Sequence, residues 1–180
     1  LLKAKKIGFN TFNPYEDEIW NIIDLLLVSP GISTSGSSSH ELVIKARFLG
    51  IMIDNDIGLF FKLLKSSRDT FNVRPKVVAV TGSNGKSTTA SLIHHILLYA
   101  GVKTQFGGNI GKSVFDLTPL KNEEIIVLEL SSYQLESANS LSPDIAVFTN
   151  FSPDHLERHG GVQGYFEAKK RLFQDGLPSI

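Results

Sequence analysis

A short apolar run that enters a helix through a glycine-containing turn is the feature that most constrains this chain. Val77–Val80 has the composition of a buried strand. It is followed by Thr81–Thr88, with the sequence Thr-Gly-Ser-Asn-Gly-Lys-Ser-Thr, and Lys86–Tyr99 then places apolar residues at helical spacing. A strand, a glycine turn and a helix in this order predict a phosphate-binding loop in an α/β fold.

The turn has the residue types that a phosphate loop needs. Glycines allow the backbone to approach phosphate oxygens, and the free N–H groups at a helix N-terminus attract anions. Lys86 is expected to reach the β- and γ-phosphates of a nucleotide, and Ser87 to offer its hydroxyl to Mg²⁺. The loop is two residues shorter than the common form, which has a glycine where Val80 stands. A plain glycine turn beside an exposed lysine is therefore the competing interpretation. The expected nucleotide contacts are Gly82, Ser83, Asn84, Gly85, Lys86, Ser87 and Thr88.

The rest of the chain alternates short apolar runs with helical patterns, which predicts an α/β fold with a largely parallel sheet. Strands are expected at Lys6–Phe9, Leu25–Val28, Ile51–Ile53, Ile125–Leu130 and Ile145–Phe148. Helices are expected at Tyr15–Ile23, Glu41–Leu49, Ile57–Lys65 and Gly164–Phe173, and a Ser/Gly-rich loop at Ser33–Ser39. The polar stretch Ser66–Pro75 predicts a boundary between residues 1–72, a partial Rossmann-like domain, and residues 73–180, a partial P-loop ATPase domain.

Composition excludes some classes of function. The 180 residues contain 18 basic and 18 acidic side chains, so there is no charge excess to favour nucleic acid or a membrane surface as a partner. Cysteine is absent, which excludes disulfides and thiolate metal sites and suits the cytoplasm. No apolar run is long enough to span a bilayer. Because the sequence begins at Leu1 and ends at Ile180 without a natural-looking stop, we expect both ends to be truncated.

Three residues after the loop have side chains suited to phosphoryl transfer. Glu129 follows the apolar run Ile125–Leu128, so its carboxylate is expected at the carboxyl edge of a parallel strand, where ligands bind. His155 follows the next strand, and Lys169 lies on the last helix. Each alone has an ordinary structural explanation, but their joint order behind a phosphate loop favours a magnesium and transfer site.

Two other groups of polar residues are candidates for functional sites, and the sequence supports each only weakly. His94 and His95 are adjacent on one helix and face different ways, so we interpret them as structural. Asp54 and Asp56 flank Asn55 as in a cation loop, but the glycine and distal glutamate of an EF-hand are missing.

Longer motifs allow a family to be recognised. They are Ser29-Pro30-Gly31-Ile32, Gly107-Gly108-Asn109-Ile110-Gly111, Leu128-Glu129-Leu130-Ser131-Ser132-Tyr133-Gln134-Leu135-Glu136 and Pro153-Asp154-His155-Leu156-Glu157-Arg158-His159. Together with the shortened phosphate loop, they resemble the Mur ligases, which add amino acids to a peptidoglycan precursor and share a fold with folylpolyglutamate synthases. The stretch after Leu128 is the most diagnostic, and it resembles the branch that adds D-glutamate.

The resemblance implies an ATP-dependent amide ligase that adds D-glutamate to UDP-N-acetylmuramoyl-L-alanine through an acyl phosphate. It implies ATP and two Mg²⁺ ions, with Ser87, Glu129, His155 and a carbamylated Lys169 as metal ligands. Lys86, His155 and Lys169 would be catalytic, and Gly31, Asn109, Ser131 and Gln134 would contact the UDP-linked substrate. Carbamylation requires a neutral amine, so we predict a lowered pKa for Lys169. A monomer is expected.

The resemblance also implies three domains, of which this sequence would hold part of the UDP-binding first and part of the ATP-binding second. The C-terminal domain that holds the incoming amino acid would be absent, so we expect the fragment alone to be inactive. Departures from the family pattern include Tyr133, where phenylalanine is common, and Asn55 and Gly58, where Gly-Asp-Ile-Glu is usual. The alternatives are another Mur ligase, a folylpolyglutamate synthase, or a nucleotide-binding module without ligase activity.

Overall fold

The computed structural model describes residues 6, 8, 10–34, 39–73, 75–118 and 121–173, which form two parallel β-sheets with packed helices. In the smaller sheet, β1 (Leu25–Leu27) pairs with β2 (Met52–Asp54). The larger sheet has the order β4-β5-β3-β6 and comprises β3 (Lys76–Thr81), β4 (Thr104–Gly108), β5 (Ile125–Glu129) and β6 (Ile145–Phe148). All of its pairings are parallel, which confirms the expected α/β class.

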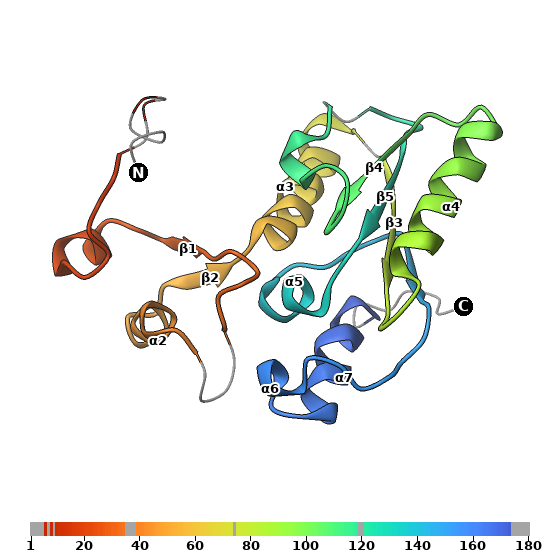
Figure 1. Ribbon diagram of the computed structural model, residues 1–180. Coiled ribbons are helices and arrows are strands. Elements are labelled where there is room, and N and C mark those ends of the chain that lie inside the picture. The colour runs from red at the N-terminus through yellow and green to blue at the C-terminus, as the bar shows by residue number, and fades with distance from the viewer. Residues whose placement is uncertain are drawn as a thin grey trace.

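The helices fall into three groups. The smaller sheet is accompanied by the 3-10 helix η1 (Asp17–Asn21) and by α2 (Glu41–Phe48). The larger sheet is flanked by α3 (Asp56–Phe71) and α4 (Lys86–Tyr99), as Figure 1 shows. The remaining elements are η3 (Val114–Asp116), α5 (Ser132–Ser137), α6 (Leu156–His159), α7 (Val162–Lys170) and η4 (Arg171–Phe173).

The larger sheet is buried on both faces because its strands alternate their side chains between two cores. Val77 and Ala79 of β3 point into a cluster with Phe61 and other residues of α3. Val80, the next residue along, packs instead with Ala90 of α4. Helices therefore cover opposite faces of one sheet, and its carboxyl edge is left for the loops that build a site.

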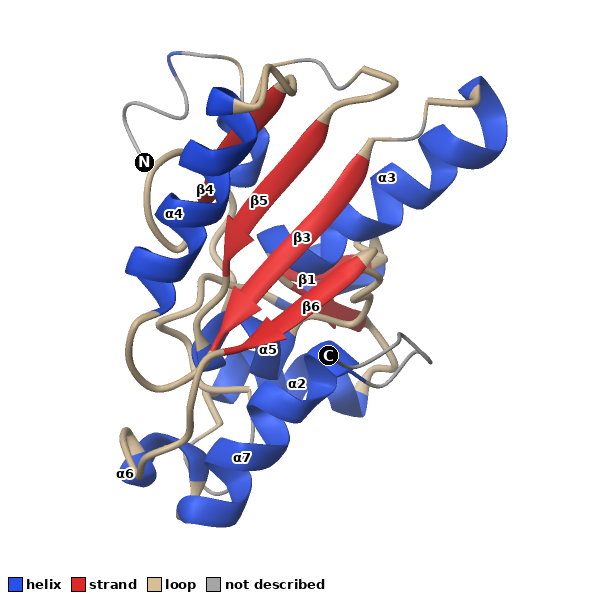
Figure 2. Ribbon diagram, turned by 90° about the vertical axis from the view of Figure 1, so that its right-hand side faces the viewer, coloured by secondary structure: helices blue, strands red, loops and turns tan. Residues whose placement is uncertain are grey.

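The carboxyl ends of the larger sheet's strands gather the short C-terminal helices. Figure 2 shows the arrowheads of β3, β5 and β6 pointing toward α5, α6 and α7. Helix α5 starts with a capping box, in which the Ser131 hydroxyl accepts from the Gln134 N–H and the Gln134 side chain accepts from the Ser131 N–H. This reciprocal cap stabilises a helix of six residues directly after β5.

Several boundaries differ from the sequence expectations. Residues 66–71, expected in a polar linker, continue α3, which ends at Asn72 in the left-handed conformation (φ 53°). The amphipathic face of α3 packs on the larger sheet, and this tertiary contact outweighs the polar composition of its last turn. The expected helix Tyr15–Ile23 is only the 3-10 helix η1. Only Lys6 and Gly8 of the strand expected at Lys6–Phe9 are described, and neither lies in a strand. Most of the Ser33–Ser39 loop lies outside the described residues.

Four elements, β4, η3, α5 and α6, were not predicted from the sequence. Strand β4 contains Thr104, Gln105 and two glycines, so it lacks the apolar composition of a buried strand, and it lies at an edge of the sheet. Helices α5 and α6 have only six and four residues, too few for a periodic pattern. The spacing of Ser131 and Gln134 is the signal that could have located α5, because it is that of a capping box.

Candidate active site

The phosphate loop requires its glycines for steric reasons. Gly82 has φ 142°, and a Cβ there would lie 2.0 Å from the Oγ1 atom of Thr149. Gly85 has φ 76° and immediately precedes α4. Ser87 and Thr88 lie exposed in the first turn of α4, so their hydroxyls are open to a ligand at the helix N-terminus. The predicted strand, loop and helix are therefore all present.

A segment that the sequence did not mark as functional holds the loop in place. It follows β6, and three of its residues make hydrogen bonds to the loop. The side chain of Asn150 accepts from the Asn84 N–H at 3.0 Å, and the Thr149 hydroxyl donates to the Asn84 carbonyl at 2.7 Å. The Ser83 hydroxyl donates to the Ser152 carbonyl at 2.8 Å. The segment after β6 thus preorganises the loop through side-chain and main-chain hydrogen bonds.

Two lysines converge on carbonyl groups of the loop. Lys86 Nζ donates to the Ser83 carbonyl at 2.8 Å, and Lys169 Nζ donates to the Gly82 carbonyl at 2.7 Å. Lys169 is 1% exposed. Burial, followed by the charge of Lys86, lowers the pKa of Lys169 to about 8, while Asp154 opposes the shift. The predicted direction of this pKa shift is confirmed.

Glu129 provides a buried carboxylate at the end of β5. Its Oε1 atom accepts a hydrogen bond from the Asn109 side chain at 3.0 Å. Its Oε2 atom has no hydrogen-bond partner among the described residues, although Glu129 is only 1% exposed. A buried carboxylate oxygen without a donor is costly unless a cation binds it, so the residue fits the predicted role of a Mg²⁺ ligand.

His155 lies at the mouth of the site. It precedes α6 in the left-handed conformation (φ 50°), and its half-exposed ring has Nε2 3.4 Å from Asp154 Oδ2. Its ring centroid is 6.4 Å from that of Tyr165, and Lys169 Nζ lies 4.5 Å from the same Tyr165 ring. His155 and Lys169 therefore share a neighbour. No cluster of three or more His, Cys, Asp or Glu side chains suited to a metal occurs within the described residues.

The residues expected to contact the UDP-linked substrate fall in three places. Ser131 and Gln134 bond to each other in the cap of α5, and Gln134 is buried. Asn109 is exposed beside Glu129, to which it donates. Gly31 lies in the turn after β1, where its carbonyl accepts from Arg158. These four residues therefore do not form one cluster, and each of the three places makes its own contacts.

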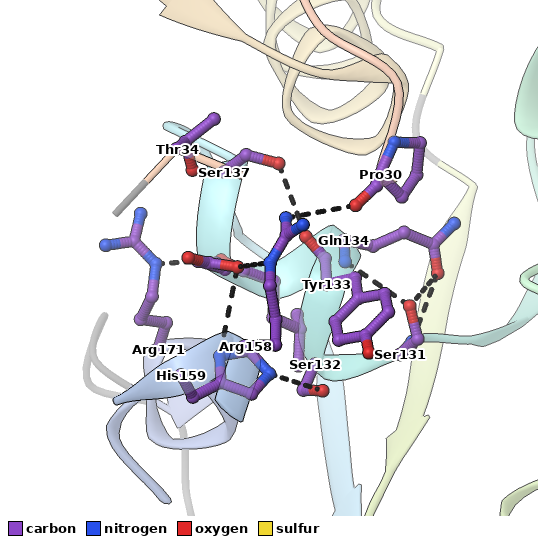
Figure 3. A network of polar contacts seen from close by, with 12 residues as sticks. Pro30, Thr34, Ser131, Ser132, Tyr133, Gln134, Ser137, Arg158, His159 and Arg171 are labelled. Carbon is purple, nitrogen blue, oxygen red and sulfur yellow. Dashed lines mark hydrogen bonds and ion pairs between the residues drawn. The ribbon is translucent and has the colours of Figure 1, made fainter. Parts of the chain in front are cut away.

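Arg158 and Glu136 are residues that sequence reasoning did not single out, although both lie in motifs that it quoted. Arg158 Nε donates to Glu136 Oε2 at 3.1 Å, and the two side chains are 14% and 6% exposed. Figure 3 shows Arg158 with His159, Ser132 and Tyr133 around it. The signal available in the sequence was weak, because a charged pair 22 positions apart has no local pattern.

His159 is the buried member of this group. Its Nε2 atom lies 3.0 Å from the Ser132 hydroxyl, and its Nδ1 atom lies 3.8 Å from Glu136. Burial lowers the pKa of His159, and the nearby Glu136 carboxylate opposes that shift. A cavity of 440 Å³ opens beside this group, lined by Tyr133, His155, Leu156, Glu157 and Arg158. A polar substrate group can approach His155 through it.

Known proteins resemble the chain in both sequence and fold. A family model described as the Mur ligase middle domain matches residues 80–179. The chain is 51% identical to a UDP-N-acetylmuramoylalanine–D-glutamate ligase of Cereibacter sphaeroides (strain KD131) and 56% identical to that of Dinoroseobacter shibae, each over 177 residues. These alignments cover 98% of this chain and 38% of each relative.

A solved structure supports the fold alone. It is a UDP-N-acetylmuramoyl-L-alanyl-D-glutamate–2,6-diaminopimelate ligase with a TM-score of 0.53 and 20% identity. The similarity covers 80% of this chain and 40% of that one. Among the described residues, no helix combines the length and apolar character needed to cross a membrane.

Proposed function

The chain belongs to the Mur ligase family, and on that premise we propose that it is part of an ATP-dependent ligase that joins D-glutamate to UDP-N-acetylmuramoyl-L-alanine. The chain spans little more than a third of its curated relatives, so the activity is proposed for the whole protein. One observation carries the proposal beyond nucleotide binding. A buried lysine of lowered pKa, Lys169, bonds to the phosphate loop itself.

The reaction requires two anions to meet. The substrate carboxylate attacks the γ-phosphate of ATP, which gives an acyl phosphate and ADP. The amine of D-glutamate then attacks the acyl carbon, and phosphate leaves. Lys86 and the N–H groups at the start of α4 would hold the β- and γ-phosphates, as the positions of Gly82 and Gly85 allow.

The proposed magnesium ligands are Ser87, Glu129, His155 and carbamylated Lys169. Two Mg²⁺ ions bound there would offset the charge between the phosphate and the carboxylate. The unpartnered Oε2 atom of Glu129 supports this ligand set, and so does the pKa of about 8 for Lys169. At that pKa, a fraction of the amine is neutral at neutral pH. The neutral nitrogen can attack the carbon of CO₂ and release a proton, which leaves an anionic carbamate.

Substrate contacts complete the proposal. Gly31, Asn109, Ser131 and Gln134 are proposed to contact UDP-N-acetylmuramoyl-L-alanine, and the cavity beside His155 would admit its reacting end. We propose that the protein acts in the cytoplasm as a monomer. The rivals are another Mur ligase, a folylpolyglutamate synthase, and a nucleotide-binding module without ligase activity.

The test uses a full-length enzyme that contains this sequence. Lys86→Ala should abolish ADP formation that depends on UDP-N-acetylmuramoyl-L-alanine, whereas Lys103→Ala, an exposed lysine at the opposite end of the sheet, should not. Normal turnover by the Lys86 variant would refute the assignment of this loop to the ligase reaction. A panel of amino acids offered to the wild-type enzyme separates the rivals, because D-glutamate alone should be joined. Absence of any amide product would favour the binding module.

A further inference from the structure

Arg158 makes a set of contacts that reaches from the candidate active site to the first part of the chain. Its guanidinium donates to three consecutive carbonyls: Nη2 to Pro30 at 3.1 Å, Nη1 to Gly31 at 2.9 Å, and Nη2 to Ile32 at 2.7 Å. These residues form the turn after β1, more than 120 positions earlier in the sequence. We call Pro30–Ile32 the substrate turn, because Gly31 is a proposed substrate contact.

The other side of Arg158 is fixed by the central part of the chain. Its Nε atom donates to Glu136 at 3.1 Å, and its guanidinium lies 4.8 Å from the centre of the Tyr133 ring. Figure 3 shows the side chain extended between Tyr133 and Pro30. Four of the five N–H groups of this largely buried guanidinium donate hydrogen bonds, one of them to a carboxylate. Its position is therefore determined from both sides.

The location of Arg158 gives these contacts a functional meaning. It lies on α6, three residues after His155, so both side chains depend on the position of one short helix. The ring of Tyr133 contacts both, with its centroid 5.1 Å from that of His155. Any movement of the substrate turn relative to α6 would break the hydrogen bonds of Arg158. Arg158 thus fixes the position of the substrate turn relative to His155.

We propose that Arg158 is a positioning residue that fixes the substrate turn against the ATP-binding part and thereby sets the affinity for the UDP-linked substrate. The proposal rests on the proposed function for the identity of that substrate. Arg158 itself takes no part in bond making. Its carbonyl contacts orient the turn's peptide groups, and lysine cannot replace the planar fork that makes them.

Kinetics of the full-length enzyme provide the first test. Arg158→Ala and the milder Arg158→Lys should raise the KM for UDP-N-acetylmuramoyl-L-alanine by about tenfold or more, since charge-assisted hydrogen bonds are lost. The KM for ATP should change by less than about twofold, because the phosphate-loop contacts are untouched. An equal rise in both KM values, or no rise in either, overturns the proposal.

Arg68 provides a matched control. Like Arg158, it donates to both carbonyl and carboxylate oxygens, here to the Pro75 carbonyl at 2.7 Å and to Asp144 at 2.8 Å, but it does so next to the amino ends of β3 and β6. Arg68→Ala should lower thermal stability without a selective change in the KM for the UDP-linked substrate. If it reproduces the KM split of Arg158→Ala, the split reflects general loosening and the positioning role is wrong.

Hydrogen exchange separates this inference from the proposed function. In Arg158→Lys, amides of a peptide covering residues 29–34 should exchange faster, while those of β3 and β5 keep the wild-type rate. An unchanged rate at residues 29–34 overturns the positioning role whatever the enzyme's substrate is. Failure of the wild-type enzyme to join D-glutamate would instead refute the proposed function, and the exchange result would still decide the role of Arg158.

Discussion

The Nζ atom of Lys169, at the end of α7, donates a hydrogen bond of 2.7 Å to the carbonyl of Gly82 in the phosphate loop. The donor is buried to 1% exposure, and the acceptor belongs to the glycine whose missing side chain lets Thr149 approach. A residue near the end of the described chain thus contacts the predicted phosphate loop. The ammonium of Lys169 lies against the loop with its charge disfavoured by burial.

Lys169 should make stability depend on alkaline pH. Its folded-state pKa of about 8 is below the ordinary 10.5, so the unfolded chain binds more protons between these values. The free energy of unfolding should therefore rise between pH 8 and pH 10.5, by about 3 kcal/mol for this group. Lys169→Met should lack that rise in urea unfolding followed across this range, whereas Lys170→Met, at an exposed neighbour, should keep it. Parallel pH profiles for the wild-type protein and Lys169→Met would contradict the assignment.

Glu129→Gln should separate stability from metal binding. The amide is cheaper to bury than a carboxylate with one unpartnered oxygen, so without Mg²⁺ the variant should be at least as stable as the wild type. Mg²⁺ with ATP should raise the Tm of the wild type but not that of the variant. The control is Glu124→Gln, a buried glutamate before the start of β5, which should respond to Mg²⁺ normally. A full Mg²⁺ response in Glu129→Gln would remove Glu129 from the ligand set.

Gly82→Ala should disable the phosphate loop. A Cβ there would lie 2.0 Å from Thr149 Oγ1 at a φ of 142°, so we expect a loss of at least about 3 kcal/mol in the free energy of unfolding together with loss of ATP binding. Gly101→Ala is the control, because its φ of 75° is also positive but no atom of the described residues lies within 4 Å of a Cβ built there. It should cost about 1 kcal/mol and leave ATP affinity unchanged, as calorimetry would show. Equal effects of the two substitutions would mean that the contact with Thr149 is unimportant.

Sequence reasoning identified the parts of the fold that have long, regular patterns. The strand Val77–Val80, the helix Lys86–Tyr99 and the parallel sheet were predicted because buried strands and amphipathic helices have distinct periods. Strand β4 was missed because an edge strand needs little apolar surface. The last turns of α3 were read as a linker because their polar residues obscure a helix that is stabilised by packing on the sheet.

For the site, local motifs were informative and long-range contacts were not. The loop glycines and Lys86 could be assigned from spacing, and the lowered pKa of Lys169 followed from the carbamylation that the family resemblance implies. The contacts of Arg158 with the substrate turn could not, because they join segments that only the fold brings together. The same holds for Asn150 and the phosphate loop.

Asn55 and Gly58, where the family resemblance leads us to expect other residues, are linked in the structure. The Asn55 side chain accepts from the Gly58 N–H at 2.9 Å and donates to the Gln134 carbonyl at 2.6 Å and the Ser137 hydroxyl at 2.8 Å. A Cβ at position 58 would lie 1.8 Å from Asp54 Oδ1, which itself accepts from the Asn139 N–H. Asn55 thus joins the start of α3 to α5. Gly58 leaves space for the Asp54 side chain, which makes a second link by accepting from the Asn139 N–H just after α5.

Two substitutions divide the role of Asn55 into its parts. Asn55→Ser keeps an oxygen that can cap α3 but loses both bonds to α5, so the free energy of unfolding should fall by about 2 kcal/mol. Asn55→Ala also removes the cap and should cost about 1 kcal/mol more. Urea unfolding of both variants measures these differences. A loss is expected because buried groups that lose a hydrogen-bond partner carry the full cost of desolvation. A serine variant as stable as the wild type would therefore show that the bonds from Asn55 to α5 do not stabilise the protein.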